Sequence, residues 1–362
     1  MIEHAYIHIP FCKRKCHYCS FVSGIDIKEQ FAYINALKSE IKQRYKNEKL
    51  KTIYFGGGTP SLLDSELLKE ILSLFSYSKD SEITIEVNPE TATTKKISEI
   101  KQAGFDRISL GVQTFSDDIL KLIGRKHSQY TIYEAIENIK NCGFKNISID
   151  LIYGLPNQTK ELFKDDLKKA TELDIQHIST YGLKIEEDSY FGKHIPTNLP
   201  NDEEQAEMFL LLCDFLKENG FEHYEISNFA KKGYRSNHNC AYWKNKNYYG
   251  FGLNASGYEE NIRYKNTSDF EAYLQNPLLK EDEETLSNQE TMENEIFLAL
   301  RLKEGVNIKE LNKKYSINFE EKYNKIIKKY TNLNLLQIDA NNCSLTEKGI
   351  LLSNNIMSEF LD

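Results

Sequence analysis

Six short apolar runs alternate with helical patterns along the first half of the chain, and this alternation restricts the fold more than any other feature. The segments between the runs carry apolar residues at helical spacing, at residues 31–41, 67–75, 95–103, 132–142 and 162–173. Repeated strand–helix units form a parallel sheet with right-handed crossovers. Six units are too few to close an eight-stranded barrel, so we predict an α/β fold with a partial (β/α)6 TIM-like barrel. The predicted strands are Tyr6–Ile9, Thr52–Phe55, Ile83–Val87, Arg107–Gly111, Ile147–Leu151 and His177–Gly182.

The second half of the chain has a different pattern. Residues 191–280 are less regular and rich in aromatic and polar side chains, and we predict that they complete the core formed by residues 1–190. The acidic segment 280–285 is a predicted linker. Residues 290–362 have helical patterns at 293–301, 308–315 and 320–330, then a hairpin around Asn341 and a last helix from Glu347. Helices followed by a two-stranded hairpin indicate a small C-terminal winged-helix-like domain.

Composition and charge exclude several classes of protein. The 362 residues carry a net charge of −8, which gives no basic surface for nucleic acid. No apolar run approaches the ~20 residues that span a bilayer, and residues 1–4 lack the features of a signal peptide. The seven cysteines are an odd number and do not indicate a disulfide framework. We therefore predict a cytoplasmic protein that is neither an integral membrane protein nor a nucleic-acid-binding protein.

Three of the cysteines, Cys12, Cys16 and Cys19, form a Cys-x3-Cys-x2-Cys loop directly after the first predicted strand. Thiolates are the usual ligands of a [4Fe–4S] cluster, and three of them leave one iron open to chelate a small molecule. The alternative is a zinc site with His8 or His17 as fourth ligand. We favour the cluster, because zinc motifs usually pair two Cys-x2-Cys half-sites and the chain has no second one.

Polar residues and glycines follow the other predicted strands at the point where each strand ends. The carboxyl ends of parallel strands meet on one rim, so these residues are expected to lie together there. Glycine allows a ligand to approach the backbone closely, and carboxylates at strand ends commonly accept hydrogen bonds from ribose hydroxyls. Singly, each of these residues is more simply structural, and it is their strand-by-strand spacing that favours a site. The residues are Gly56–Pro60 after the second strand, Glu86 and Asn88 after the third, Gln113 and Arg125 after the fourth, and Asp150 at the end of the fifth.

The segment His238–Trp243 contains the only tryptophan of the chain. A histidine beside a Tyr-Trp pair has the residue types of an axial haem ligand with aromatic walls. Equally, the segment is a loop whose aromatic side chains cover the open barrel, and the residues alone favour this second interpretation. The Gly-x-Gly-x-x-Ala pattern at 250–255 is not interpreted as a dinucleotide site, because no strand–helix–strand unit surrounds it.

Several motifs occur together in a characteristic order, and they extend nearly from end to end of the chain. They resemble the oxygen-independent coproporphyrinogen III oxidase superfamily of radical S-adenosylmethionine (SAM) proteins, and most closely its HemW-type haem chaperone branch. The motifs are Tyr-Ile-His-Ile-Pro-Phe-Cys at 6–12, Phe-Gly-Gly-Gly-Thr-Pro-Ser at 55–61, Ser-Leu-Gly-Val-Gln-Thr-Phe at 109–115, Ile-Gly-Arg-Lys-His at 123–127, Asp-Leu-Ile-Tyr-Gly-Leu-Pro at 150–156, Tyr-Glu-Ile-Ser-Asn-Phe at 224–229 and His-Asn-x-x-Tyr-Trp at 238–243.

This resemblance implies three bound groups. A [4Fe–4S] cluster is expected on Cys12, Cys16 and Cys19. Haem is expected in association with residues 191–280, with His238 as the ligand that the resemblance favours and Cys240 as an alternative. SAM contacts are expected from Tyr6, Gly57, Gly58, Thr59, Glu86, Gln113, Arg125 and Asp150.

Two features separate the chaperone branch from the oxidase. The oxidase has a fourth cysteine two residues after the third, where this chain has Phe21, and it has a long segment before the cluster loop, where this chain has eleven residues. The expected function is therefore to bind haem and pass it to acceptor haemoproteins, such as membrane-bound respiratory complexes, without coproporphyrinogen oxidase activity. The alternative is the oxidase itself, which decarboxylates coproporphyrinogen III to protoporphyrinogen IX. One departure from the family is Ser256, which stands where a histidine is common.

Overall fold

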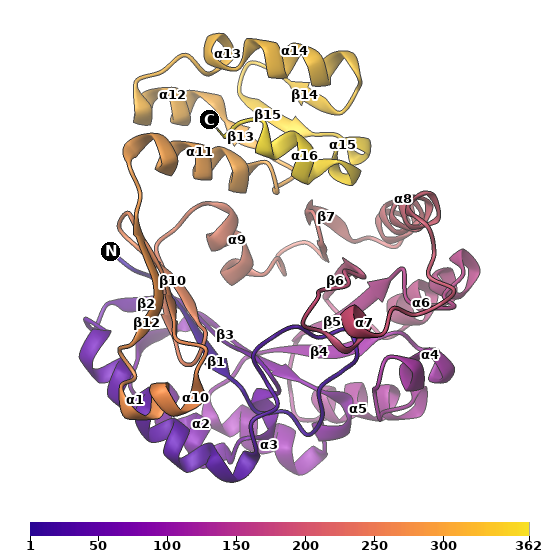
Figure 1. Ribbon diagram of the computed structural model, residues 1–362. Coiled ribbons are helices and arrows are strands. Elements are labelled where there is room, and N and C mark those ends of the chain that lie inside the picture. The colour runs from indigo at the N-terminus through magenta and orange to yellow at the C-terminus, as the bar shows by residue number, and fades with distance from the viewer. Residues whose placement is uncertain (362) are drawn as a thin grey trace.

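The six predicted strands form the centre of one sheet in a computed structural model that describes residues 1–361 (Figure 1). They run parallel and lie side by side in chain order, with β9 (Tyr249–Phe251) added beside β1, and β8 (Asn228–Ala230) and β7 (Glu222–Glu225) added beyond β6. This arrangement confirms the predicted partial barrel. The six strands are β1 (His4–Ile9), β2 (Lys49–Gly57), β3 (Ser76–Val87), β4 (Arg107–Gln113), β5 (Asn146–Tyr153) and β6 (His177–Gly182).

The two faces of this sheet differ in chemistry, because apolar and polar residues alternate along β1 to β5. Apolar side chains lie on the outer face against the crossover helices, which cover that face in Figure 1. Polar side chains lie on the inner face, which curves around a hollow. The helices are α1 (Gln30–Arg44), α2 (Ser65–Leu72), α3 (Thr94–Ala103), α5 (Gln129–Asn141) and α6 (Lys160–Glu172). The outer-face residues are Ala5, Ile7 and Ile9 on β1, Ile53 and Phe55 on β2, Ile83, Ile85 and Val87 on β3, Ile108, Leu110 and Val112 on β4, and Ile147, Ile149 and Leu151 on β5.

The crossover helices begin at side chains that satisfy their free N–H groups. Asp64, Thr93, Ser128 and Thr159 stand at the N-caps of α2, α3, α5 and α6, and each accepts a hydrogen bond from a backbone N–H of the first turn. Such caps stabilise a helix by about 0.5–2 kcal/mol. Helix α3 ends at Gly104, which has φ of +113° and turns the chain back toward the sheet.

Residues 183–280 are more regular than the sequence pattern suggests. Helix α8 (Asp202–Glu218) packs against α6, while β7, β8 and β9 pair with the two edges of the parallel sheet. Strands of three or four residues are too short to give a periodic signal, so the sequence did not reveal them. These additions cover both edges of the six-stranded sheet.

The linker predicted at residues 280–285 is wrong. This segment is β12 (Lys280–Thr285), which pairs antiparallel with β11 (Ile262–Asn266), and β11 pairs in turn with β10 (Ser256–Glu259). All six residues of β12 are exposed and polar, a composition typical of a linker, and only the backbone pairing with β11 identifies a strand.

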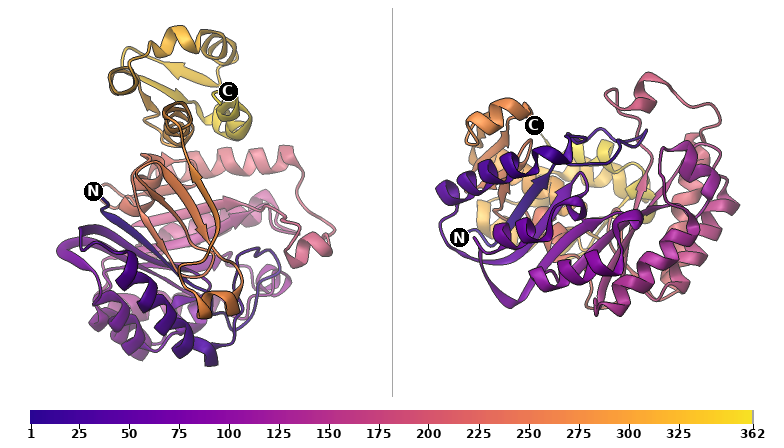
Figure 2. Two further views of the ribbon diagram at one scale, coloured as in Figure 1. Left: turned by 60° about the vertical axis from the view of Figure 1, so that its left-hand side comes forward. Right: turned by 90° about the horizontal axis from the view of Figure 1, so that it is seen from below.

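The C-terminal part stands apart from the helix-covered face of the sheet, as the left view in Figure 2 shows. It contains helices around a three-stranded sheet in the order β13–β15–β14, as expected for a winged-helix-like unit. The helix predicted at 320–330 is divided at Tyr323 into α13 and α14. Its elements are α11 (Asn288–Ala299), β13 (Val306–Asn307), α12 (Ile308–Tyr315), α13 (Phe319–Lys322), α14 (Asn324–Asn332), β14 (Leu336–Ile338), β15 (Asn342–Leu345), α15 (Glu347–Leu351) and α16 (Ser353–Ser358).

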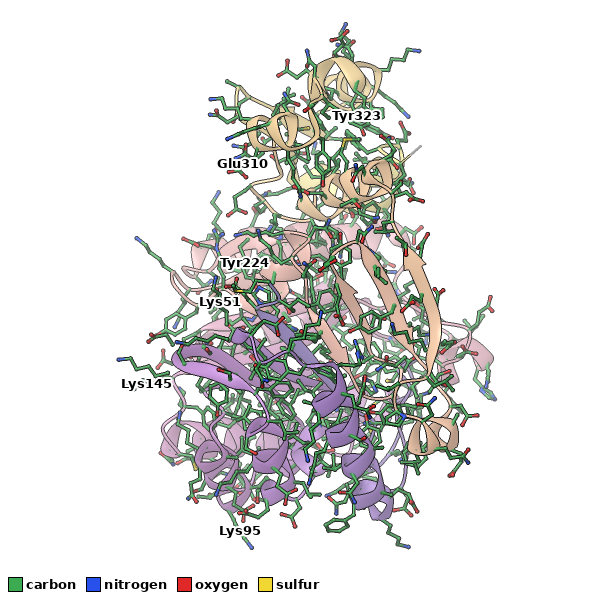
Figure 3. All side chains as sticks on the ribbon, turned by 90° about the vertical axis from the view of Figure 1, so that its left-hand side faces the viewer. Lys51, Lys95, Lys145, Tyr224, Glu310 and Tyr323 are labelled. Atoms are coloured by element: carbon green, nitrogen blue, oxygen red, sulfur yellow. The ribbon has the colours of Figure 1, made fainter. Side chains whose placement is uncertain are left out.

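Backbone hydrogen bonds join this part to the sheet near Tyr224. Lys303 N–H donates to the carbonyl of Tyr224 at 3.1 Å, and Ile226 N–H donates to the carbonyl of Arg301 at 3.0 Å. Tyr224 is fully buried and lies between the main sheet and the C-terminal helices, as its label in Figure 3 shows. The chain around β7 therefore contacts both parts of the molecule.

A buried carboxylate ties α1 to the segment that follows β9. Glu40 has no exposed surface, and its two oxygens form an ion pair with Arg44 at 2.6 Å and accept hydrogen bonds from Gly252 N–H, Asn266 Nδ2 and the Tyr273 hydroxyl, each at 2.7–2.8 Å. Burial raises the pKa of Glu40. Because all partners of this carboxylate are in place, it stabilises contacts between residues more than 200 positions apart.

Replacing Glu40 by Ala is expected to destabilise the protein by about 3–5 kcal/mol, because it removes one of the two carboxylates that pair with Arg44 and leaves the buried Tyr273 hydroxyl and Gly252 N–H without their acceptor. The measurement is the urea midpoint of unfolding. Glu70→Ala is the control, since Glu70 pairs with Lys38 on the surface with 51% of its side chain exposed, and such pairs contribute about 1 kcal/mol or less. Equal midpoints for the two variants would contradict the role of Glu40.

Candidate functional site

A cavity of about 440 Å³ opens at the carboxyl ends of the parallel strands. Its volume is in the range of sites for small organic ligands. Ten of the twelve predicted site residues line it, and Tyr6 and His238 do not. The ten are Cys12, Cys16, Cys19, Gly57, Gly58, Thr59, Glu86, Gln113, Arg125 and Asp150.

The cysteine loop follows β1 and is held against the turn after α4 (Asp117–Leu122). The backbone N–H of His17 donates to the carbonyl of Ile123 at 3.0 Å, and its Nδ1 lies 2.8 Å from the carbonyl oxygen of Leu122. On the other side, Phe191 N–H donates to the carbonyl of His17 at 2.9 Å. The three thiols at 12, 16 and 19 are half-buried and in no disulfide, and burial raises the pKa of each.

The geometry does not support the zinc alternative. Both ring nitrogens of His8 are in hydrogen bonds, Nε2 with the carbonyl oxygen of Val22 at 2.9 Å and Nδ1 with the Tyr6 hydroxyl at 3.1 Å, and neither His8 nor His17 lines the cavity that the three cysteines face. Within residues 1–361, no group of three His, Cys, Asp or Glu side chains converges as ligands of one metal ion. A cluster with several irons spreads its ligands more widely, and the cysteine spacing suits it.

A chain of hydrogen bonds links the cysteine loop to the ends of β2 and β3, and we call it the rim belt. Thr59 Oγ1 lies 3.5 Å from Cys12 Sγ and accepts a hydrogen bond from Asn88 Nδ2 at 2.9 Å. Asn88 Oδ1 accepts one from Arg125 Nη1 at 2.6 Å. Arg125 Nη2 donates to the hydroxyl of Tyr18 at 2.7 Å, and Tyr18 belongs to the cysteine loop again. The belt therefore fixes Arg125 between the strand ends and the loop.

The end of β4 has an unusual backbone. Gln113 is buried and has φ of +70°, a conformation that residues other than glycine rarely adopt and that is common at functional sites. Two residues earlier, a Cβ on Gly111 would lie 3.0 Å from Asn88 Oδ1 and from Gln113 Nε2, and 3.3 Å from Arg125 Nη2. Glycine at 111 therefore gives these three side chains the space to converge.

Glu86 projects from β3 into the cavity and is held by two donors. Its carboxylate accepts hydrogen bonds from the Tyr54 hydroxyl at 2.9 Å and from Gly57 N–H at 3.1 Å. Burial, together with the negative charge of Asp150, raises the pKa of Glu86 to about 7. Gly57 has φ of +109°, and a Cβ there would lie 2.4 Å from the ring of His8, so only glycine fits.

Asp150 lies across the cavity from Glu86, on the inner face of β5. It accepts a hydrogen bond from Ser109 Oγ at 3.1 Å. Burial raises the pKa of Asp150, while hydrogen bonds from Ser179 and Ser109 lower it. The cavity thus contains two oriented carboxyl groups and the guanidinium of Arg125.

Tyr6 and His238 lie outside the cavity lining and contact Tyr54, which belongs to it. The Tyr6 ring stacks on Tyr54 with centroids 6.2 Å apart, and the His238 ring stacks on the same tyrosine at 5.1 Å. Both ring nitrogens of His238 are in hydrogen bonds, Nδ1 with Thr52 Oγ1 and Nε2 with the Tyr242 hydroxyl, each at 2.7 Å. Burial lowers the pKa of His238 well below 6.5, so the ring is neutral at pH 7.

Several cavity residues were missed from the sequence. They share a position on the inner face of a central strand, and the alternation of polar and apolar residues within each strand is the signal that identifies them. Tyr18 is the exception, because it lies in the cysteine loop and no local pattern indicates its contact with Arg125. The missed residues are Tyr18, Tyr54, Arg107, Ser109, Ser179 and Tyr181.

Comparisons with known proteins agree with this geometry. Two family models match the chain, the Radical SAM superfamily over residues 6–170 and the HemN C-terminal domain over residues 286–352. The heme chaperone HemW of Lactococcus lactis is 41% identical, covering 99% of this chain and 97% of that protein. The heme chaperone HemW of Bacillus subtilis is 36% identical, covering 99% of each. The chain belongs to the HemW family of radical SAM proteins.

A solved structure extends this similarity to the fold. Coproporphyrinogen III oxidase HemN of Escherichia coli, described as a radical SAM enzyme, superposes with a TM-score of 0.87 at 22% identity, covering 99% of this chain and 89% of that one. HemW-family and HemN chains therefore share the barrel and the C-terminal unit.

Radical SAM proteins contain a [4Fe–4S] cluster and SAM, and the cavity of this HemW-family chain fits both. Three thiols of one loop face the cavity and leave one coordination position to a ligand. SAM has a carboxylate, a positively charged amino group and sulfonium, and ribose hydroxyls. The cavity offers one fixed guanidinium and two oriented carboxyl groups for these groups, at Arg125, Glu86 and Asp150.

Replacing Asn88 by Ala is expected to weaken SAM binding roughly tenfold, because Arg125 loses one of its two rim-belt partners. Iron content should be unchanged, since all three cysteines remain. Isothermal titration of the anaerobically reconstituted protein measures the affinity. Asn138→Ala is the matched control, because Asn138 also bridges two segments, with Nδ2 donating to the Ala92 carbonyl, but lies outside the cavity. An unchanged affinity in Asn88→Ala would exclude the rim belt from SAM binding.

SAM affinity is expected to rise between pH 6 and pH 7.5, up to roughly fivefold, because Glu86 ionises over this range and SAM is a cation. Binding a cation lowers the pKa of Glu86, so binding releases a proton and is stronger above pH 7. Glu86→Gln should bind SAM more weakly at pH 7.5 and without this dependence. The measurement is the dissociation constant of both proteins at four pH values, and the same slope in both would contradict the assignment.

Proposed function

We propose that this chain binds haem and delivers it to acceptor haemoproteins. The observation that carries the proposal is similarity over nearly the whole chain to relatives named heme chaperones, at 36–41% identity. A second observation favours this branch over the oxidase of the same fold. Phe21, which stands where the oxidase has its fourth cysteine, is 63% exposed and lines the mouth of the cavity.

Cys12, Cys16 and Cys19 would hold the [4Fe–4S] cluster in this function. When bound, such a cluster supplies an electron to the sulfonium of SAM. The protein's own part is to hold the ligand, and Arg125, fixed by Asn88 and Tyr18, suits the carboxylate of SAM.

The remaining SAM contacts come from the strand ends. Glu86 and Asp150 suit the positively charged and hydroxyl-bearing parts of the molecule, and Gln113 adds an amide from the strained end of β4. Gly57, Gly58 and Thr59 form the edge beside the cluster. Tyr6 lies outside the cavity lining, and its part in this proposal is to support the ring of Tyr54, on which it stacks.

Haem is the cargo in this proposal, and residues 191–280 are the region associated with it. The cavity mouth has two exposed aromatic side chains, Phe21 and Tyr181, which offer apolar contact to a planar macrocycle. Axial coordination by His238 stays a prediction, and it requires His238 to release Thr52 or Tyr242. Cys240 remains the alternative ligand, although burial raises the pKa of its thiol to about 11.

We further propose a cytoplasmic site of action and membrane-bound respiratory complexes among the acceptors. All seven cysteines are free thiols, as is usual in a reducing compartment. Across residues 1–361, no helix has the length and hydropathy needed to cross a membrane.

The test is an anaerobic titration of the reconstituted protein with haem, followed by Soret absorbance. The wild type is expected to bind haem stoichiometrically, and His238→Ala is expected to shift the Soret band and weaken binding if His238 is the ligand. His194→Ala is the control, because His194 is an exposed histidine outside the cavity. Identical spectra for wild type and His238→Ala would exclude His238, and absence of haem binding by the wild type would overturn the function.

The same protein incubated with SAM, a reductant and coproporphyrinogen III is expected to form no protoporphyrinogen. Product formation would overturn the chaperone proposal and favour the oxidase.

A further inference from the structure

Arg107 is a buried arginine whose charge has no direct partner. It is the first residue of β4, is 2% exposed and lines the cavity from the inner face of the sheet. Among residues 1–361, no carboxylate forms an ion pair with it, and its Nε has no hydrogen-bond partner. An unpaired buried charge is costly, so proteins rarely keep one without a use.

The strands on both sides of Arg107 have unpartnered polar atoms at the same level. In the sheet register, Arg107 pairs with Thr84 of β3 and with Asn146 of β5. Thr84 Oγ1 and Asn146 Oδ1 are buried and, within the described chain, also have no hydrogen-bond partner. Paired residues of parallel strands project to the same face, so these three side chains form one row across three strands.

The carboxyl groups around this row are engaged elsewhere, and Glu82, two residues before Thr84 on β3, accepts hydrogen bonds from the backbone N–H groups of Asn237 and His238. Glu86 accepts from Tyr54 and Gly57, and Asp150 accepts from Ser109. The charge of Arg107 lowers the pKa of Asp150, so the two are near each other, but no contact within 4.0 Å joins them.

The neighbouring histidines do not compensate the charge either. His177 and His238 are neutral, because burial and the charge of Arg107 lower the pKa of both. Both ring nitrogens of His177 are in hydrogen bonds, with Ser148 Oγ at 2.7 Å and the Tyr224 hydroxyl at 2.8 Å. His238 is saturated in the same way, so neither ring offers an acceptor to the guanidinium.

We propose that Arg107 binds a carboxylate of a ligand that enters the cavity. The guanidinium presents a planar pair of donors that matches a carboxylate. A phosphate is disfavoured, because it would bring a second negative charge beside Glu86 and Asp150.

This inference rests on the proposed function for its choice of ligand. Haem carries two propionates, and one of them is the carboxylate that Arg107 binds. The other source of the same chemistry is the methionine carboxylate of SAM, for which Arg125 at the rim is better placed.

The experiment compares ligands that differ only in their free carboxylates. Haem is compared with haem dimethyl ester, and SAM with decarboxylated SAM, on anaerobically reconstituted wild type, Arg107→Met and Arg107→Lys. The wild type is expected to bind haem roughly tenfold more tightly than the ester, the loss typical of one charge-assisted hydrogen bond. Arg107→Met is expected to bind haem and the ester equally, with its preference for SAM over decarboxylated SAM unchanged.

Arg301→Met is the matched control. Arg301 is partly buried, and its Nε has no hydrogen-bond partner in the described chain, but it stacks on Trp243 outside the cavity. The control should keep the wild-type preference for haem over the ester. Arg107→Lys keeps the charge without the planar donor pair, so it should lose only part of the preference for haem over the ester. This variant replaces Arg107→Met in the comparison if Arg107→Met does not fold.

Each outcome decides the inference. If Arg107→Met loses the preference for SAM over decarboxylated SAM but keeps the preference for haem over its ester, Arg107 binds a carboxylate, and that carboxylate belongs to SAM. Unchanged preferences for both ligand pairs in a folded Arg107 variant would overturn the inference. If the wild type binds no haem, the proposed function fails, while the SAM pair still decides whether Arg107 binds a carboxylate.

Discussion

The alternation of apolar and polar residues along the parallel strands β1 to β5 is the constraint on which the rest of the structure depends. Apolar side chains on one face pack against the crossover helices, and this burial, at about 25 cal/mol for each Å² of apolar surface, stabilises the sheet. The side chains of the inner face are therefore not needed to pack against the helices. The inner face holds tyrosines, serines, carboxylates and Arg107 around a cavity of about 440 Å³, so the same strands that form the core also form the site.

The rim belt connects the cysteine loop to this frame. The loop has no secondary structure of its own between Cys12 and Cys19, so its position depends on contacts with other elements. Thr59, Asn88 and Arg125 supply them from the ends of β2 and β3 and from the turn after α4. A cluster on this loop and a ligand on Arg125 therefore share one set of hydrogen bonds, which orders both groups on the rigid ends of the strands.

The sequence predicted the six strands and the rim residues because both have local signals, a repeating strand–helix unit and unusual residues at strand ends. It did not predict β12, whose six exposed polar residues look like a linker, nor the short edge strands β7, β8 and β9. For His238, the sequence indicated an aromatic environment but not the hydrogen bond to Thr52, because this bond joins residues 186 positions apart. Long-range pairings of this kind depend on the completed fold and leave no local pattern.

The charged side chains of the cavity are available to ligands of opposite charge, because they do not pair with one another. Glu86, Asp150 and Arg107 have no ion pair with one another, and each is held by neutral donors or by none. If these charged side chains formed ion pairs with one another, each entering ligand would have to break an ion pair before it could bind. Here the carboxyl groups stay available to a cation and the guanidinium to an anion, and the neighbouring histidines are neutral and add no charge. The site is therefore organised for a ligand, or a pair of ligands, that brings both signs of charge, which is the chemistry of SAM beside a carboxylate-bearing cargo.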